Sequence, residues 1–358
     1  ALEKNVKIYP FQSYSWNESW VKTIGKNKKY KIIIVIVLSG EITTAIFPFC
    51  IEEKYKLKEL KLIGTAMNDY NYPIFSSLVD ESDLNDLWEY AISSVNEYDL
   101  INISRVPEYD LQGRKTIFTN SFRKERFRAP ELLLNRDWKL NSKGKIKTII
   151  RTNKRKRNQL NKIGKYRFDI LQSQKDCLNA LEVGFSQKKR RYEETNVPNI
   201  LEDSSTRDFY KYVAVNLGDR VKKHLSALWL DNVMIAFHLG FISDNIFYWY
   251  FPTFEAGEWG RYSPGSLILE ELCNLSYDQK IKIFDFTIGD EGYKYYWNNS
   301  NKNLYNLLRG HSLKGKAFAN MIILVDFLKS IRMLKLAFKY IKSSTCFLVK
   351  PFLGNLRK

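Results

Sequence analysis

Residues that build metal sites and disulfide frameworks are scarce in this sequence. Its 358 residues include three histidines and four cysteines, and no pair of cysteines has the CxxC spacing. Zinc motifs and disulfide-rich secreted folds both need such residues in clusters. The scarcity argues against a metal enzyme, apart from sites built from carboxylates, and it favours free thiols in a reducing compartment.

Long hydrophobic runs are missing as well. The most apolar stretch, IIIVIVL at 32–38, is much shorter than the roughly 20 residues of a transmembrane helix. The turn residues Ser39-Gly40-Glu41 follow it, and a second apolar run begins at position 42, so the pattern predicts a buried β-hairpin. The sequence also has no convincing signal-peptide pattern. We therefore expect a cytoplasmic protein.

What the sequence has in abundance is positive charge and aromatic residues. Lys and Arg number 57 against 39 Asp and Glu, a net charge of +18, and aromatic residues make up 15%. Such a charge suits a polyanion, an anionic membrane surface or a phosphorylated substrate, and it does not choose among them. The length exceeds what one hydrophobic core usually organises, so two domains are expected.

The order of predicted elements in the second half of the chain indicates a cofactor site. Three antiparallel strands precede a Gly-containing loop, a helix and a further strand. A helical crossover returns the chain in the same direction, so the last strand should lie parallel to the third. Free N–H groups at the start of that helix attract anions, and the two parallel strands would diverge there around a nucleotide-like cofactor. The predicted strands cover 221–231, 233–243, 245–255 and 281–288, and the helix covers 266–276.

The last of these strands runs into an unusual segment. IKIFDFTIGDEGYKYYW at 281–297 starts as a strand, places Asp285 inside it, and then carries acids, phenols and a lysine. Asp is disfavoured in strands and rarely buried without a partner. Together with SPGSLIL at 263–269, the segment is similar to the CelD-like acetyltransferases, which have two GNAT-like halves and an architecture related to the FemAB transferases. PFQSYSWNESW, GTAMNDYNYPIF and NQLNKIG agree with this resemblance, which spans roughly residues 8–310.

The resemblance implies an α/β fold of two tandem GNAT-like mixed-sheet domains with a C-terminal basic helical tail. We expect a degenerate GNAT-like domain on the acceptor side at 1–145, a catalytic acyl-CoA-binding GNAT domain at 146–310, and the tail at 311–358. The implied reaction is acyl transfer from acetyl-CoA, or another acyl-CoA, to an amine or hydroxyl by direct attack on the thioester. The expected acceptor is a sugar, glycolipid or polysaccharide precursor.

The candidate phosphate-binding loop departs from the GNAT pattern Q/R-x-x-G-x-G/A. Pro264 stands in place of the first Gly and Ser266 in place of the last Gly or Ala. Proline has no N–H to donate to a phosphate, although it suits the first turn of a helix. A purely structural cap is therefore an alternative interpretation of Ser263-Pro264. We predict cofactor contacts from Arg261, Tyr262, Ser263, Gly265 and Ser266.

Attack on a thioester requires a base, a donor for the carbonyl oxygen and an acid for the departing thiolate. By the resemblance, a backbone N–H within Tyr248–Phe251 serves the carbonyl oxygen, and we assign this contact to Trp249. Tyr293 is placed to be the acid. Tyr295 and Tyr296 are alternates, for which packing is the favoured interpretation.

Five residues are candidates for the general base. A buried carboxylate paired with a cation, such as Lys294 or an arginine, is an equal interpretation of Asp285. A histidine that alternates with apolar neighbours in a strand, as His238 does, more often belongs to the core. The candidates are Asp285, Asp290, Glu291, Glu255 and His238.

Contacts with the acceptor are expected from both halves of the chain. In the first half they come from a loop rich in Asn, Asp and Tyr, residue types that also favour ordinary turns. Lys294 could instead contact a cofactor phosphate or form a surface ion pair. The predicted acceptor-binding residues are Asp69, Tyr70, Glu255, Asp290, Lys294 and Trp297.

Two basic segments bear on possible partners. KRKR at 154–157 lies in a predicted helix, and because no nucleic-acid recognition motif accompanies it we interpret it as a solvated face. The tail over 316–342 predicts a basic amphipathic helix, or a pair of helices, that could pack on the protein or lie in an anionic membrane interface. We favour the second, which would place the protein at the inner face of the membrane. The cations that would share one face are Lys329, Arg332, Lys335, Lys339 and Lys342.

Two other functions stay open. The net charge and KRKR favour a FemAB-like transferase that uses aminoacyl-tRNA, and the SPG loop and the segment after Asp285 disfavour it. The chain could also be an inactive GNAT-fold binding module, in which Pro264 marks the loss of cofactor binding.

Overall fold

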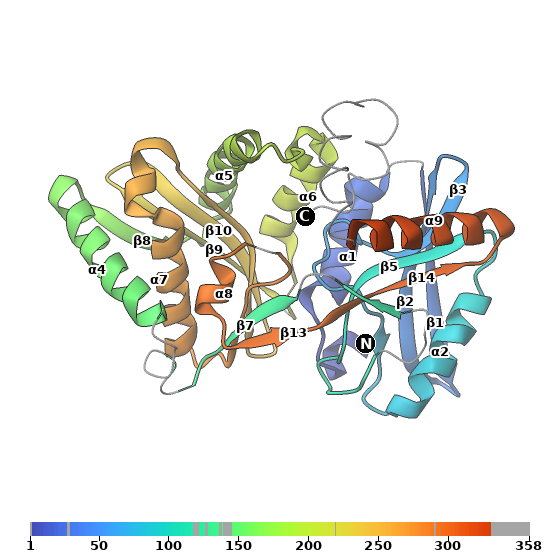
Figure 1. Ribbon diagram of the computed structural model, residues 1–358. Helices are drawn as coiled ribbons and strands as arrows, with labels where there is room; N and C mark the ends of the chain where they lie inside the picture. Colours follow the sequence, from blue (N-terminus) through green and yellow to red (C-terminus); the bar gives the residue numbers. More distant parts are fainter. Residues whose placement is uncertain are drawn as a thin grey trace. The chain divides into compact units, whose positions relative to one another are not determined.

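The chain folds into two compact units, each made of two separate pieces of sequence (Figure 1). The computed structural model describes residues 2–26, 29–116, 122–125, 128–135, 138, 145–218, 220–289 and 291–330. Unit 1 comprises Ala1–Lys26 and Arg126–Leu304, and unit 2 comprises Asn27–Glu125 and Tyr305–Lys358. These limits differ from the predicted boundary at 145/146, because Trp16 packs on the sheet of the second half and residues 129–133 form a strand within it.

Unit 1 contains the strand order that the sequence predicts. Within the described residues its sheet has seven strands, in the order β13-β7-β12-β11-β10-β9-β8. β9, β10 and β11 are antiparallel neighbours, and β12 pairs parallel to β11, which confirms the predicted crossover. The strands are β7 (Ala129–Leu133), β8 (Tyr166–Ile170), β9 (Lys222–Leu230), β10 (Val233–Ser243), β11 (Ile246–Phe254), β12 (Ile283–Asp285) and β13 (Ser300–Lys302).

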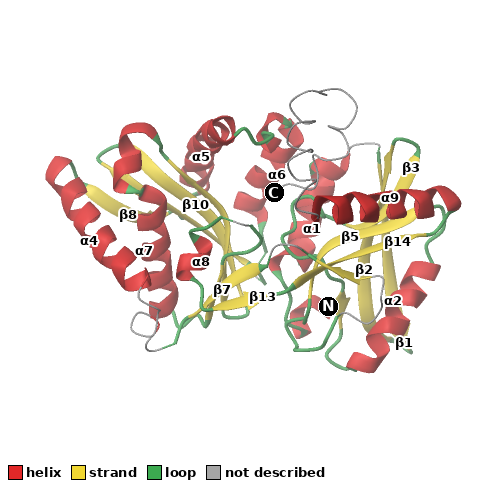
Figure 2. Ribbon diagram, viewed as in Figure 1, coloured by secondary structure: helices red, strands yellow, loops and turns green. Residues whose placement is uncertain are grey.

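Helices cover both faces of this sheet (Figure 2). One face packs against α4 and α7 around Phe247, Trp249 and Phe284. The other face packs against α1, α5 and α6, where the ring of Trp16 contacts those of Phe209 and Phe241 edge-on. These helices are α1 (Tyr14–Lys22), α4 (Lys145–Ile163), α5 (Gln174–Thr195), α6 (Ser204–Asn216) and α7 (Pro264–Asp278), and the short α8 is Lys294–Trp297.

Unit 2 repeats the same order of elements. Three antiparallel strands, β1, β2 and β3, precede α2, and β5 then pairs parallel to β3. Among described residues the sheet order is β1-β2-β3-β5-β14-β6, with β4 on β2. The strands are β1 (Tyr30–Ser39), β2 (Ile42–Lys54), β3 (Leu57–Leu62), β4 (Ile74–Phe75), β5 (Leu100–Pro107), β6 (Phe122–Lys124) and β14 (Leu304–Gly310), and the helices are α2 (Leu84–Ser93) and α9 (Leu313–Ser330).

The hairpin predicted from IIIVIVL is confirmed, but its expected burial holds for one face only. Val37 and the partly buried Val35 pack on the unit 2 core, whereas Ile34, Ile36 and Leu38 point to the opposite face and are exposed. Strand side chains alternate between the two faces, so a continuous apolar run does not reveal which face lacks cover.

Several predicted features fall outside the described residues. They include Asp290, Cys346 and the tail from 331 onward. Short 3₁₀ helices complete the described chain: η1 (Leu2–Asn5), η2 (Pro10–Gln12), η3 (Ile24–Lys26), η4 (Glu81–Asp83), η5 (Ile200–Glu202) and η6 (Gly257–Tyr262). None of the helices in the described part of the chain combines the length and apolarity needed to span a bilayer.

Candidate functional site

β11 and β12 separate after a short parallel pairing. Tyr248 aligns with Asp285, where β12 ends, while β11 continues to Phe254. Thr287 then turns away with φ +56°; its hydroxyl donates to the carbonyl oxygen of Trp249 (3.1 Å), and its N–H donates to Asp285 Oδ1 (2.7 Å). The Thr287 side chain thus donates the hydrogen bond that a backbone N–H would have given to the Trp249 carbonyl if β12 had continued. The predicted divergence of the two strands begins at this point.

A strand irregularity lies beside the divergence. The register between β10 and β11 shifts between Leu239 and Phe241. A Cβ at Gly240 would collide with the carbonyl oxygen of Tyr248 and with the ring of His238, so no larger residue fits without movement. Bulges bend a strand and re-aim its side chains. Here the irregularity falls within the stretch of β11 that the sequence assigns to the thioester carbonyl.

Asp285 is a buried carboxylate held by a cation. Its Oδ2 lies 3.0 Å from the ammonium of Lys302, which also lies 2.9 Å from Glu131. Burial opposes the charge of Lys302, but the Asp285 carboxylate outweighs it and holds the pKa of Lys302 well above its usual value. Burial raises the pKa of Glu131, and Lys302 opposes the rise. Of the two interpretations, the contacts favour the structural one, with Lys302 rather than Lys294 as partner.

Tyr293 and His238 are brought together through Trp249. The indole Nε1–H of Trp249 donates to the phenol oxygen of Tyr293 (2.9 Å), and the His238 ring stacks on the Trp249 ring at 4.3 Å and 12°. Burial raises the pKa of Tyr293, with Glu291 adding to the effect, so the phenol keeps its proton at neutral pH. Burial lowers the pKa of His238 well below its usual range, which fits the core interpretation of this residue.

The segment between β12 and α8 is fixed by Lys294. Its buried ammonium donates to the carbonyl oxygen of Ile288 (2.9 Å) and forms an ion pair with the carboxylate of Glu291 (3.1 Å). Lys294 therefore stabilises its own loop, where Glu291 and the Ile288 carbonyl oxygen are the partners of its ammonium. Glu291 is exposed on the same segment, and Trp297 at the end of α8 is buried in the core.

The N-terminus of α7 carries the predicted phosphate loop. Ser263 precedes the helix in the left-handed region (φ +51°), and its hydroxyl accepts from Lys156 (2.5 Å) instead of capping the helix. Its carbonyl oxygen accepts from the N–H groups of Ser266 (2.9 Å) and Leu267 (3.2 Å). A Cβ at Gly265 would lie 2.8 Å from the Phe254 ring, so close packing requires this glycine.

Residues of α4 that the sequence did not single out hold this loop in place. Asn153 donates to the carbonyl oxygen of Ser266 (3.2 Å) and to Glu270 (2.8 Å), and the guanidinium of Arg157 bonds Glu270 and Glu271, both at 2.7 Å. The solvated-face interpretation of KRKR suits the exposed Lys154 and Arg155. It is wrong for Lys156 and Arg157, which face α7. The only sequence signal was the four-residue spacing from Asn153 to Arg157, which places both on one helix face.

The two residues before Ser263 differ in exposure. Tyr262 is buried, and the guanidinium of the exposed Arg261 lies over its ring at 4.9 Å.

Glu255, at the end of β11, is neutralised by α5. One carboxylate oxygen pairs with Arg190 (2.5 Å), and the other accepts from Gln187 (3.3 Å). Gln187 is buried and also accepts from Thr253 (2.7 Å), so α5 fixes this end of the strand.

Asp69 and Tyr70 belong to unit 2 and are both buried there. Asp69 lies 3.7 Å from the guanidinium of Arg105, which donates to the backbone oxygen of Asn68 (2.7 Å). Arg105 thus holds this loop within unit 2, and acceptor binding by Asp69 and Tyr70 stays a prediction.

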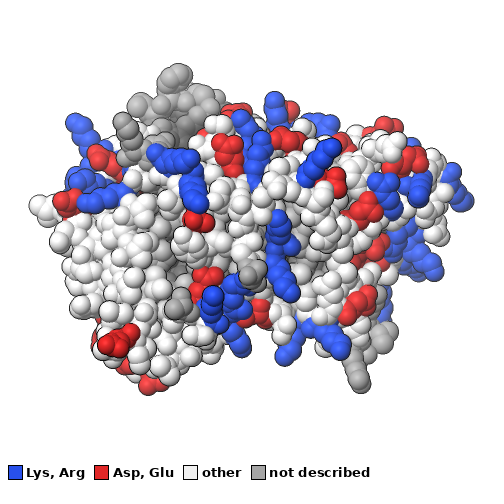
Figure 3. Space-filling model, turned by 180° about the vertical axis from the view of Figure 1, so that it is seen from behind, with Lys and Arg blue, Asp and Glu red and all other residues white. Residues whose placement is uncertain are grey.

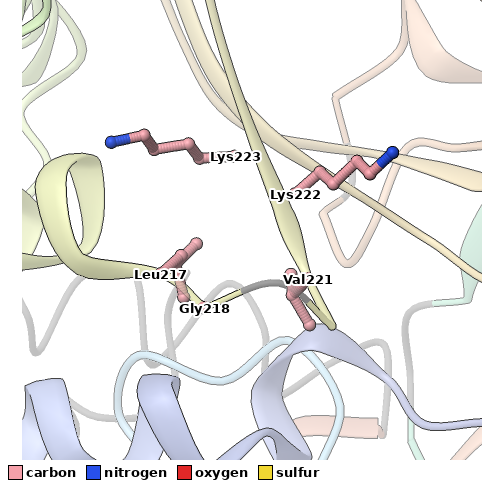
Figure 4. Close-up of a pocket in the computed structure, with 5 residues that line it drawn as sticks. All are labelled: Leu217, Gly218, Val221, Lys222 and Lys223. Atoms are coloured by element: carbon pink, nitrogen blue, oxygen red, sulfur yellow. The ribbon is translucent and has the colours of Figure 1, made fainter.

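Cations are dispersed over the surface. In Figure 3, Lys and Arg side chains spread over the face seen from behind, with acidic side chains among them. An open pocket of about 400 Å³ in unit 1 is lined by Leu217, Gly218, Val221, Lys222 and Lys223. The two lysines point away from each other (Figure 4), so they do not converge on a shared ligand.

Metal-ligating side chains are not gathered in the described residues, where no group of three or more His, Cys, Asp or Glu could hold an ion. Cys50, Cys177 and Cys273 are buried free thiols.

Comparison with known proteins identifies the second half of the chain. Residues 149–295 match a family model described as an acetyltransferase (GNAT) domain. This range contains most of α4, all of α5 to α7 and β8 to β12, and most of the candidate site. A search of curated proteins finds no significant match.

Solved structures match nearly the whole chain. A conserved protein of unknown function from Bacteroides thetaiotaomicron is 15% identical, with a TM-score of 0.53 over 85% of this chain and 93% of that one. FemX is 10% identical, with a TM-score of 0.53 over 84% and 93%. L-PGS from Bacillus licheniformis is 10% identical, with a TM-score of 0.52 over 86% and 96%. At these identities the likeness establishes the fold. Residues 149–295 thus match the GNAT acetyltransferase domain model, and the chain as a whole shares its fold with FemX and L-PGS.

Proposed function

We propose that the chain transfers an acyl group from acyl-CoA, with acetyl-CoA as the expected donor, to an amine or hydroxyl of a sugar, glycolipid or polysaccharide precursor. The observation that carries the proposal is the position of Tyr293. Its phenol lies beyond the end of β12 in the GNAT domain, and its oxygen already accepts the Trp249 N–H. Accepting that bond leaves its own proton available for donation.

The acid is Tyr293. Attack on the thioester breaks the carbon–sulfur bond, and the thiolate that leaves needs a proton. A phenol carries its proton at neutral pH and can supply it, and the Trp249 N–H stabilises the phenolate that remains against the burial that raises the pKa of Tyr293.

The carbonyl oxygen is bound by a backbone N–H of Tyr248–Phe251. Such donors work when their positions are fixed before the reaction. Thr287 on one side of β11 and the stacked His238 ring on the other hold Trp249 in place.

The general base in this proposal is Glu291. Asp285 is paired with Lys302, Glu255 with Arg190, and the His238 ring is buried among aromatic rings. Glu291 is paired as well, with Lys294 (3.1 Å), but its side chain is 58% exposed, against 0% for Asp285 and 18% for Glu255. It lies two residues from Tyr293.

The cofactor phosphates are held at the start of α7. Pro264 has no N–H, and the N–H groups of Ser266 and Leu267 bond the Ser263 oxygen, so fewer backbone donors face an anion here than in the GNAT pattern. Lys156 supplies a cation at the same place, beside the positive end of the helix dipole. The residues fit a phosphate group if this lysine replaces the missing N–H, with Arg261 as a second cation.

Contact with an anionic membrane through the C-terminal region is part of the same proposal. In α9, Leu313, Met321 and Leu324 are exposed, and the sequence has no acidic residue after Asp326. Exposed apolar side chains next to cations suit an anionic lipid interface. A lipid-linked acceptor would give this contact a use.

A FemAB-like aminoacyl-tRNA-dependent transferase is the second candidate. The observation that favours it is α4, which contains no acidic residue and exposes Lys147, Arg151, Lys154, Arg155 and Lys162.

Thermal unfolding with acetyl-CoA, free CoA or tRNA separates these functions. A ligand that binds only the folded chain at 100 times its Kd stabilises it by about 2.7 kcal/mol. Stabilisation by acetyl-CoA and CoA supports the proposal, whereas salt-sensitive stabilisation by tRNA alone supports the second candidate. No response to any of the three indicates a non-catalytic binding module.

A further inference from the structure

β1 is the edge strand of the unit 2 sheet among the described residues. It stands at the end of the strand order and pairs with β2 along one side, from Tyr30 to Ser39. Within the described residues no strand pairs with its other side. A free edge of this length offers a row of unpaired backbone N–H and C=O groups to any second strand.

The outer face of the same hairpin is aliphatic. The exposed fractions are 50% for Ile34, 55% for Ile36 and 57% for Leu38. We call these three residues the hairpin patch. The register sets Ile36 beside the partly buried Ile46, so the same face stays aliphatic from β1 to β2.

The usual protection of a sheet edge is sparse in β1. Natural edges carry lysines, prolines, bulges or inward-pointing charges that hinder pairing. The only charged residue within β1 is Lys31, which pairs with Glu97 (3.2 Å), and the register with β2 shifts between Val37 and Leu38. Between these two points the strand carries no charge and is rich in β-branched residues, a composition that favours pairing with another strand.

The charges that border the patch are balanced. Lys29 pairs with Glu52 (3.0 Å), and Lys61 lies between Glu52 (2.7 Å) and Glu59 (2.9 Å), which makes two lysines and two glutamates. An anionic lipid surface would call for unpaired cations at this border. A neutral border fits a neutral apolar surface instead.

A second copy of the chain presents such a surface. Two copies with a net charge of +18 repel each other, so they can associate only across a region without net charge. The part of Figure 3 formed by unit 2 has a broad area without charged side chains. If two β1 strands ran antiparallel about a two-fold axis near Val35, Ile34 would face Ile36 of the copy, and Lys31 would face Ser39 rather than another lysine.

We propose that β1 pairs antiparallel with β1 of a second copy, joining two unit 2 sheets into one and covering both hairpin patches. The interface is isologous, because the same strand and patch serve on both sides. Backbone hydrogen bonds between the two β1 strands would make the interface specific, and the hairpin patches would supply its buried apolar area. The proposal does not depend on the reaction that the GNAT domain catalyses.

The test is the mass of the full chain in solution by sedimentation velocity, from about 0.1 to 100 μM. Wild type should sediment at twice the 42.2 kDa chain mass. Ile34→Lys with Ile36→Lys should raise the dimer dissociation constant at least tenfold, because it places cations at the two-fold axis. Leu78→Lys, at a position 73% exposed elsewhere in unit 2, is the control and should leave the dimer unchanged.

Hydrogen exchange makes the test specific to β1. The amides of 30–39 should exchange more slowly in the wild-type dimer than in the double variant, with equal melting temperatures for both proteins. A wild type that stays monomeric throughout the range overturns the proposal. So does a dimer that survives the double variant, or a patch that instead binds phosphatidylglycerol vesicles.

Discussion

The ammonium of Lys302 lies 3.0 Å from the carboxylate of Asp285, which is fully buried, while the Lys302 side chain is 14% exposed. The pair joins β13 to β12 across β7, whose Glu131 bonds the same ammonium (2.9 Å). This pairing explains how Asp285 can lie inside the predicted strand 281–288, where an aspartate is disfavoured.

Lys302→Met should lower the free energy of unfolding by about 3–5 kcal/mol, because it leaves buried carboxylates without their cation. Urea unfolding followed by circular dichroism measures the loss. The double variant Lys302→Met/Asp285→Asn should be more stable than Lys302→Met alone. A single variant within 1 kcal/mol of wild type would contradict the assigned pairing.

Tyr293→Phe should lower kcat about 10²–10⁴-fold, the range for loss of a general acid, and leave the Kd for acetyl-CoA unchanged. Trp249→Phe removes the hydrogen bond to the phenol oxygen but keeps an aromatic ring beside His238 and leaves the Tyr293 proton in place, so its effect on kcat should be smaller. Steady-state kinetics with equilibrium binding separates the two quantities. The exposed Tyr296→Phe serves as control. Unchanged kcat in Tyr293→Phe would remove this residue from the mechanism.

Lys156→Met should weaken acetyl-CoA binding about 10–100-fold, since a charge-assisted hydrogen bond contributes about 1.5–3 kcal/mol. Isothermal titration calorimetry gives the Kd. Lys162→Met changes an exposed lysine of the same helix and should bind as wild type does. Equal affinities in both variants would mean that α4 only supports the loop.

The stability of unit 1 should fall as the pH drops from about 6.5 to about 4. Burial lowers the pKa of His224 from 6.5 to about 4. Between these values the unfolded chain binds a proton that the folded chain does not, so stability is present above pH 6.5 and is lost on acidification. The loss reaches about 3 kcal/mol.

Melting temperatures between pH 4 and 7 check this slope. His224→Leu should reduce it, with the remaining slope carried by the buried His238, and the exposed His311→Gln should leave it unchanged. A slope that is identical in wild type and His224→Leu would assign it to other groups.

The sequence was sufficient for the order of strands in the second half of the chain. Tight turns at Asp231 and Asp244, the latter followed by Asn245 with φ +62°, separate three apolar strands, and such signals are local. The parallel return of β12 followed from the handedness and length of a helical crossover. Pattern and connection length together determine this part of the fold.

The sequence did not predict contacts between segments that are far apart in the chain. Lys302 stands 17 residues from Asp285 in an unremarkable NKN context, and Lys156 stands 107 residues from Ser263. Both lysines have the appearance of surface residues, because burial of a lysine depends on tertiary partners that no local pattern shows. The same reason explains why Lys294 was assigned to the cofactor or the acceptor, whereas it bonds its own loop.

The interleaving of the two units in the chain constrains how the protein is made. Unit 1 needs residues near both ends of its range, from Phe11 and Trp16 to the strand at 300–302, with some one hundred residues of unit 2 synthesised in between. At about 5–20 residues per second, the ribosome delivers Lys302 roughly 15–60 seconds after Trp16. During that interval the N-terminal aromatic residues have no sheet to cover. A chaperone that binds exposed aromatic segments would therefore find its substrate at the N-terminus, and neither unit could be produced intact as one continuous fragment.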